Sequence, residues 1–204
     1  DGAATFNQDI SSWNTSAVIS MFAMFRNASS YNQNMKTIGN SWNTSSVISI
    51  GRMFQGATVF NGDITNWNTS SVIEIEYLFS DAVAFDQDIS SWNTAAATSM
   101  FRVFFNAPSF NQNIGNWNTS SVTNMGEMFN SALTFNQNIG NWNTAAVTDM
   151  YAMFYNTPSF NQNLTHNGNS WNLGNVMDMN QMFQGSGLSI ANYDIFLYSQ
   201  ANNT

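Results

Sequence analysis

Residues 110–134 read FNQNIGNWNTSSVTNMGEMFNSALT, and the chain contains seven copies of this unit. One tryptophan marks each copy, at Trp13, Trp42, Trp67, Trp92, Trp117, Trp142 and Trp171. A phenylalanine follows at the same step, at Phe25, Phe54, Phe79, Phe104, Phe129, Phe154 and Phe183. The period is 25 residues, and it lengthens to 29 in two copies. A fixed period of about 20–50 residues is typical of stacked repeat architectures.

Each copy divides into an extended half and a more tightly wound half. In the first copy, residues 6–13 place apolar side chains between short polar pairs, which indicates an extended segment. Residues 14–16 form a polar corner. From residue 18 to residue 28, apolar side chains recur at steps of three and four, which predicts one helical or 3₁₀ turn. We therefore expect a β-rich repeat solenoid of about seven stacked coils with short helical or 3₁₀ turns.

The last residues depart from the repeat. We assign residues 1–187 to the solenoid and residues 188–204 to a C-terminal capping segment. Ser189 is a suitable N-cap for a short helix. We expect the apolar side of that helix to carry Leu188, Tyr193, Phe196 and Leu197. The chain begins inside a repeat without a recognisable cap, so we expect it to be part of a longer array.

The composition excludes several classes of function. Charged residues make up 8% of the chain, the formal net charge is −8, and the basic residues are Arg26, Lys36, Arg52 and Arg102. Nucleic-acid binding needs clustered Lys and Arg that neutralise phosphates, so we exclude it. No apolar run approaches the ~20 residues of a membrane-spanning helix. The chain has no cysteine, which excludes disulfides and thiolate metal sites.

The recurring tryptophans are expected to form a core ladder rather than a sugar-stacking surface, because every coil would turn them inward. The asparagine after each tryptophan is expected to form a structural ladder that hydrogen-bonds the corner backbone. These residues are Asn14, Asn43, Asn68, Asn93, Asn118, Asn143 and Asn172. Candidate N-glycosylation sequons begin at Asn14, Asn27, Asn43, Asn68, Asn118, Asn163 and Asn202. Asn93 and Asn143 keep the asparagine without a sequon, which favours the structural role.

The two long copies carry four extra residues before the tryptophan, in residues 35–42 and 164–171. Both insertions contain Gly and Asn, as loops do. They hold Lys36 and His166, the single lysine and the single histidine of the chain. Two such bulges would frame a binding face, but tolerated surface insertions are the favoured interpretation.

Catalytic chemistry has little support in the sequence. One histidine without a cysteine gives no nucleophile and base pair, and the carboxylates are scattered over the repeats. Asp9, Asp63 and Asp88 recur before the isoleucine of their repeats, where other copies have Asn. Such a stack would offer oxygen ligands to Ca²⁺, but a solvated surface is favoured. We expect no enzymatic activity, no catalytic residues, no metal site and no cofactor.

The unit FNQDISSWNTSxVxxMxxMFxxA resembles the repeat of BspA-like leucine-rich-repeat surface proteins, and GLSIANYDIFL resembles the end of those arrays. The resemblance covers essentially the whole chain. It implies a leucine-rich-repeat-like fold, an extracellular or cell-surface location, and a role in adhesion without catalysis. Those relatives carry Trp-Asp-Val-Ser-Asn-Val at the corner, whereas this chain carries Trp-Asn-Thr-Ser-Ser-Val.

Three functions from different classes follow. The first is a surface protein for adhesion or recognition, whose lateral face binds a protein or glycan on another surface. The second is a subunit of a self-assembling, glycosylated extracellular fibre, in which the partners are copies of the chain. The third is ice binding by the threonines that follow the ladder asparagines, Thr15, Thr44, Thr69, Thr94, Thr119 and Thr144.

Overall fold

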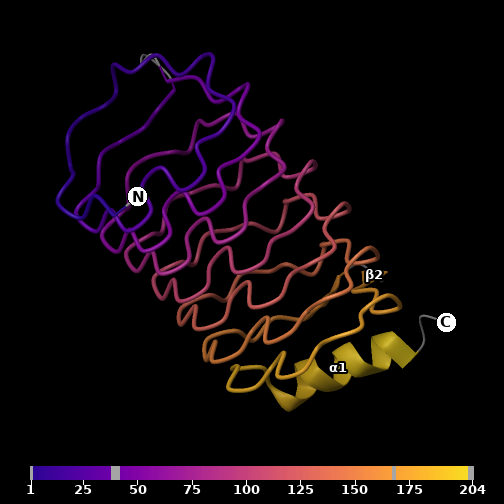
Figure 1. Ribbon diagram of the computed structural model, residues 1–204. Helices are drawn as coiled ribbons and strands as arrows, with labels where there is room; N and C mark the ends of the chain where they lie inside the picture. The colour runs from indigo at the N-terminus through magenta and orange to yellow at the C-terminus, as the bar shows by residue number, and fades with distance from the viewer. Residues whose placement is uncertain (1, 38–41, 167–168, 202–204) are drawn as a thin grey trace.

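The computed structural model describes residues 2–37, 42–166 and 169–201. Figure 1 shows successive repeats lying side by side along one axis, from the N-terminus to a helix at the other end. We call residues 2–187 the repeat stack. The named elements are β1 (Thr165–His166), β2 (Asn169–Ser170) and α1 (Ile190–Ala201). No helix in the described ranges is long and apolar enough to cross a membrane.

The prediction of a β-rich, leucine-rich-repeat-like solenoid is wrong. The described residues contain two strands of two residues each, β1 and β2, which pair antiparallel inside the second insertion. Neighbouring repeats share isolated parallel bridges, one residue from each repeat, instead of a sheet. These bridges join Ser20, Ser49, Glu74, Ser99, Asn124, Asp149 and Asp178 in that order.

The extended half of each repeat is not a strand because side chains replace the backbone acceptors of a sheet. A parallel ladder requires backbone N–H groups to donate to backbone carbonyls of the next strand. Here the N–H of Asn136 donates instead to Oδ1 of Asn111 at 2.9 Å, and the N–H of Asn161 donates to Oδ1 of Asn136 at 2.9 Å. An amide side chain therefore connects the repeats where a sheet was expected.

The wound half of each repeat is a series of turns rather than the predicted helical or 3₁₀ turn. Two positions in each repeat, four residues apart, have a positive φ, which interrupts both strands and right-handed helices. These pairs are Ala23 and Asn27, Arg52 and Gly56, Tyr77 and Asp81, Arg102 and Asn106, Glu127 and Ser131, Ala152 and Asn156, and Gln181 and Gly185. We call each such run, for example residues 150–156, a turn segment.

Backbone hydrogen bonds in a turn segment go two ways. The N–H of Phe154 donates to the carbonyl of Met182 in the next repeat at 2.9 Å, and the N–H of Ala152 donates to Asn180 at 2.9 Å. The N–H of Tyr155, the residue after Phe154, donates within the same repeat to the carbonyl of Ala152 at 3.1 Å. Apolar residues recur at steps of three and four because these residues point into the core, and the segment that carries them is not a helix.

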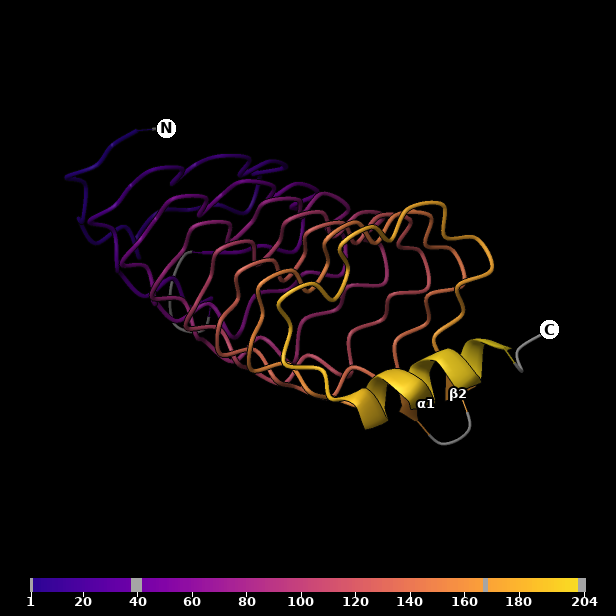
Figure 2. The ribbon, with the colours of Figure 1, turned by 90° about the horizontal axis from the view of Figure 1, so that it is seen from below.

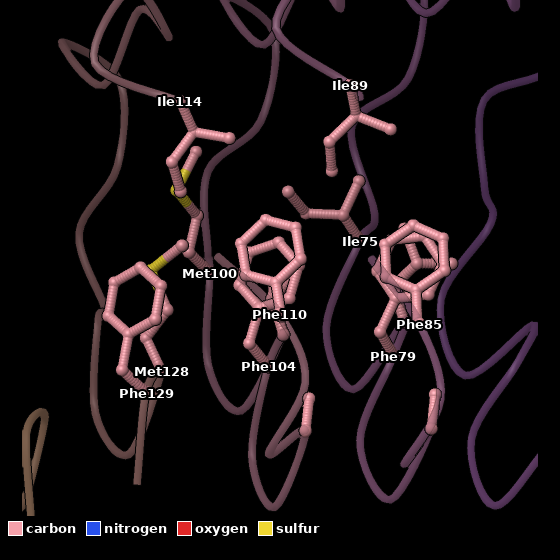
Figure 3. Close-up of a cluster of buried hydrophobic side chains, with 14 of the residues drawn as sticks. Ile75, Phe79, Phe85, Ile89, Met100, Phe104, Phe110, Ile114, Met128 and Phe129 are labelled. Atoms are coloured by element: carbon pink, nitrogen blue, oxygen red, sulfur yellow. The ribbon is translucent and has the colours of Figure 1, made fainter. Parts of the chain in front are cut away.

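The core is a set of aromatic columns that run along the stack. Within one repeat, Phe79 and Phe85 stack at 3.7 Å between ring centroids, and the pair Phe104 and Phe110 repeats this contact at 3.8 Å. Figure 3 shows these pairs side by side, with Ile89 on the upper side of one pair and Ile114 on the upper side of the other. Phe79 and Phe104 also stack between repeats at 5.8 Å. Each repeat therefore buries its apolar residues against its neighbours.

The C-terminal segment forms α1, which lies across the end of the repeat stack in Figures 1 and 2. Oγ of Ser189 accepts the N–H of Asn192 at 3.3 Å, as an N-cap does. Phe196 is buried and meets Phe183 edge to face at 5.5 Å. Tyr193 and Leu197, expected on the apolar side of the helix, are exposed, because no further repeat in the described chain covers them.

Candidate functional site

The tryptophans of the second to seventh repeats are buried, and each indole N–H donates to a backbone carbonyl of the preceding repeat. Trp117, for example, donates to Ile89 at 3.1 Å. Stacking also joins neighbouring rings, such as Trp67 and Trp92 at 6.0 Å. Trp13 departs from the expected core ladder, since 48% of it is exposed. It lies in the first repeat of the chain.

The asparagine after each tryptophan closes a local turn. In all seven repeats its Oδ1 accepts the N–H two residues later, at 2.8–3.1 Å. These asparagines are exposed. They hydrogen-bond the corner of their own repeat through this acceptor, which is an Asx turn rather than a bond between repeats.

A second amide row, which the sequence analysis missed, connects the repeats. It follows the aromatic residue of the FNQ motif and comprises Asn7, Asn32, Asn61, Asp86, Asn111, Asn136 and Asn161. Each Oδ1, that of the Asp86 carboxylate included, accepts a backbone N–H from the following repeat, or from Ser189 just before α1, at 2.7–3.0 Å. The next glutamine reinforces it, as when Nε2 of Gln137 donates to Asn111. The recurrence of FNQ in the sequence was the available signal.

The threonine row proposed for ice binding lies inside the protein. Thr15, Thr44, Thr69, Thr94, Thr119 and Thr144 are all buried. Oγ1 of Thr94 donates to the carbonyl of Asn118 at 2.9 Å, and the same bond recurs along the row. Buried and bonded hydroxyls cannot offer a flat hydroxyl array to ice, so the basis of that hypothesis is removed.

The candidate sequons lie on the surface where the structure describes them. Asn14, Asn27, Asn43, Asn68, Asn118 and Asn163 are exposed, and Asn202 lies outside the described residues. Asn27 has a φ of 59°, and Oδ1 of Asn163 is bonded to Thr165. Exposure makes these side chains accessible, and nothing in their geometry distinguishes a modified from an unmodified asparagine.

The insertions contribute few contacts to a shared site. Lys36 pairs with Asp63 at 2.8 Å, while His166 belongs to β1 in the other insertion. Residues 38–41 and 167–168 lie outside the described residues. The described chain contains no group of three or more His, Asp or Glu side chains suited to one metal ion.

The recurring aspartates considered as calcium ligands close turns instead. Oδ1 of Asp9 accepts the N–H of Ser11 at 2.8 Å, and Oδ1 of Asp88 accepts that of Ser90 at 2.9 Å. The Ser11 backbone bond lowers the pKa of Asp9, and the Ser90 side-chain bond lowers the pKa of Asp88. Asn113 and Asn138 make the same turn with a neutral amide.

Chemical variety is concentrated on the outer side of the turn segments. While the Trp, Asn and core positions repeat, the residue after the first core residue of the segment is Phe22, Gly51, Glu76, Phe101, Gly126, Tyr151 and Asn180 in successive copies. The next position is Ala23, Arg52, Tyr77, Arg102, Glu127, Ala152 and Gln181. Three of the four basic residues lie in these segments, including Arg26.

The middle repeats combine these positions into one cluster. We call Arg52, Tyr77, Phe101, Arg102 and Phe105 the Arg–aromatic face. The guanidinium of Arg52 lies 4.2 Å from the centre of the Tyr77 ring, and Phe101 meets Tyr77 edge to face at 5.3 Å. The guanidinium of Arg102 lies 4.7 Å from the Phe105 ring. All five residues are partly exposed, so their rings and guanidinium groups reach solvent.

The two arginines of this face have different electrostatic surroundings. Nε and Nη2 of Arg102 both donate to Oε1 of Glu127, at 3.0 and 2.6 Å. The described chain gives Arg52 no carboxylate partner within 4.0 Å, and its charge rests on the Tyr77 ring. A cation on an aromatic face is held in place without being neutralised. Arg52 therefore presents an uncompensated positive charge on a protein of net charge −8.

The backbone of the Arg–aromatic face has the conformation that recurs at this position in every turn segment. Arg52, Tyr77 and Arg102 have φ values of 57°, 57° and 55°. This left-handed conformation costs about 1–2 kcal/mol for a residue with a side chain, whereas glycine adopts it freely. The chain nevertheless places large side chains at these positions. Comparing the seven copies position by position would have pointed to this face from the sequence.

These features define a class: a repeat protein of stacked turn segments with one chemically variable face. The chain belongs to the family described as "Mycoplasma protein of unknown function, DUF285", whose model matches residues 1–40, 36–117 and 87–195. That description assigns no function. It supports a repeat family, and it does not reproduce the finer resemblance to BspA-like proteins. No curated protein and no solved structure matched the chain.

Proposed function

We propose that this chain is a non-enzymatic, extracellular surface protein that recognises a glycan or protein on another surface through the Arg–aromatic face. The observation that carries the proposal is the gathering of Arg52, Tyr77, Phe101, Arg102 and Phe105 on one side of an otherwise uniform repeat stack. The resemblance of the repeat to BspA-like surface proteins points in the same direction.

The chemistry of this face suits recognition. Arg and aromatic residues are enriched at binding hot spots because they bury large areas with little loss of side-chain entropy. The partly exposed rings of Tyr77 and Phe101 offer aromatic contact area, and Arg52 supplies a charged donor for hydroxyl or carboxylate oxygens. The amide and hydroxyl rows on other sides of the stack are occupied by the bonds that hold the repeats together.

A binding screen tests the proposal. The protein would be applied to a glycan array and to extracts of cell-surface proteins, and each hit would be titrated. We expect Tyr77→Ala and Arg52→Ala to weaken binding at least tenfold. Arg52→Lys tests whether the flat guanidinium is needed in addition to its charge. Asn116→Ala, an exposed change away from this face, is the matched control and should leave binding unchanged. If every hit binds Tyr77→Ala and Arg52→Ala as tightly as the unchanged protein, or if the screen gives no hit, the proposal is contradicted.

The fibre hypothesis has less support. Stacking copies end to end would require the last repeat to expose its core, but α1 lies there and Phe196 packs on Phe183. Sedimentation at rising concentration tests it, because a fibre subunit forms particles that lengthen as the concentration rises. Particles of constant size at all concentrations contradict the hypothesis.

A further inference from the structure

The seventh turn segment carries backbone N–H groups that have no hydrogen-bond acceptor in the described residues. In the sixth repeat, four N–H groups donate to carbonyls of the seventh repeat at 2.8–2.9 Å. Their equivalents in the seventh repeat are the N–H groups of Met179, Gln181, Phe183 and Gly185. Within the described chain none of these four groups has a hydrogen-bond acceptor. An eighth turn segment would supply the missing carbonyls.

Helix α1 replaces the other half of an eighth repeat. The N–H of Ser189 donates to Oδ1 of Asn161 at 2.9 Å, which continues the amide row between repeats. Nδ2 of Asn192 donates to Asn161 as a glutamine does in earlier repeats. The side chain of Gln200 reaches the carbonyl of Trp171. The place of the FNQ motif is thus filled, while the place of the turn segment is not.

The unfilled place is a groove of about 440 Å³ between the last turn segment and α1. Figure 2 shows α1 beside the final winding of the repeat stack. The walls include Met179, Gln181, Phe183, Leu188, Tyr193 and Leu197, and no charged residue. Phe183 is only partly buried, whereas the corresponding Phe154 is fully buried. The groove therefore combines open backbone donors with an incompletely covered aromatic column.

We propose that this end groove binds a short peptide segment of a partner protein, which lies along the seventh repeat as an eighth turn segment. Its backbone carbonyls accept the four free N–H groups, and an apolar side chain such as Phe covers Phe183. The occupant follows from the stack itself, because each earlier turn segment is covered by a segment of this kind. Adding a chain to an open backbone edge is a known mode of peptide recognition.

The absence of charge on the groove walls favours an uncharged, apolar segment over an acidic or basic one. A complete repeat of a second copy does not fit there, because α1 already occupies part of its place. This binding site is separate from the Arg–aromatic face, so either proposal can fail without the other.

The test uses a fluorescent peptide with the sequence of residues 148–158, TDMYAMFYNTP, which contains the sixth turn segment. Fluorescence anisotropy with the full chain should show saturable binding, and a peptide with Phe154→Asp should bind at least tenfold more weakly. Hydrogen exchange at Gln181 and Phe183 should slow when the peptide is bound. A peptide bound elsewhere on the described chain is not expected to protect these two amides.

Protein variants locate the binding. Leu197→Asp places a charge in the groove and should weaken binding at least tenfold, as should Met179→Asp on the opposite wall. Ile195→Asp is the matched control, since Ile195 is exposed on the same helix outside the groove. Circular dichroism checks that each variant folds. Absence of binding, or binding that both groove variants leave unchanged, overturns the proposal. Protection of the same amides by self-association assigns the groove to a second copy and also overturns it.

Discussion

Individual residues in this chain are placed by hydrogen bonds that reach the neighbouring repeat. A buried tryptophan fills the core and its indole N–H finds a carbonyl one repeat earlier. A buried polar atom without such a partner costs free energy, because it has lost its bonds to water. The indole N–H of Trp92 has such a partner, whereas the hydroxyl of Tyr31 has none among the described residues.

Trp92→Ala should lower the free energy of unfolding by about 3–5 kcal/mol, the range for large aromatic residues removed from a core. The indole is buried, stacks on Trp67 at 6.0 Å and donates to Ile64 at 3.3 Å. Urea denaturation measures the change. Trp13→Ala is the control and should cost much less, since Trp13 is half exposed. Equal losses for the two variants would contradict the inward placement of Trp92.

Tyr31→Phe should stabilise the protein by about 1–3 kcal/mol, the usual penalty of an unsatisfied buried polar group. The Tyr31 hydroxyl is buried and has no hydrogen-bond partner among the residues that the structure describes, and burial raises the pKa of Tyr31. Later repeats have phenylalanine there, such as Phe60. Thermal unfolding measures the gain. The reverse change, Phe60→Tyr, should destabilise, and an unchanged melting temperature in both variants would mean that water satisfies the hydroxyl.

At the scale of the repeat unit, two amide rows of similar composition have different roles. Asn118 closes a turn within its own repeat, whereas Asn111 bonds the backbone of the next one. The two rows differ in whether the backbone N–H that each side chain accepts belongs to the same repeat or to the next one. Bonds between repeats hold the stack together, because the stability of a repeat array includes the interfaces of nearest neighbours.

Asn111→Ala should therefore cost more stability than Asn118→Ala. The first change leaves the part-buried N–H of Asn136 without its acceptor and removes the hydrogen bond from Gln137. We expect it to lower the free energy of unfolding by about 1–3 kcal/mol. The second removes one exposed turn bond, which is worth about 0.5–1.5 kcal/mol. Chemical denaturation of both variants provides the comparison. A larger loss for Asn118→Ala would reverse the assignment of the two rows.

For the whole molecule, acidic turns link stability to pH. The Ser11 backbone bond holds the pKa of Asp9 below 3.8, and the Ser90 side-chain bond does so for Asp88. A carboxylate with a depressed pKa in the folded state stabilises the fold above its unfolded pKa. That contribution is lost as the pH falls through the folded value. We expect a lower urea midpoint at about pH 3 than at about pH 6.

The double variant Asp9→Asn and Asp88→Asn is the matched control, because Asn113 and Asn138 make the same turn in other repeats. An amide keeps the bond but does not titrate, so the variant should lose less stability between the two pH values. An identical pH dependence in both proteins would place the acid sensitivity elsewhere, for example at Asp63, where burial opposes bonds from Lys36 and Thr65.

The sequence by itself determined the repeat and most of the inward-facing positions, since the period and the apolar spacing are visible in seven copies. It also predicted the C-terminal helix from Ser189 onward. Only the tertiary structure decided that the coils are turns without a sheet, because the side chain of Asn111 accepts a backbone N–H of the next repeat and Tyr77 has a positive φ. The Arg–aromatic face and the end groove depend on the same contacts between repeats, which no single repeat specifies.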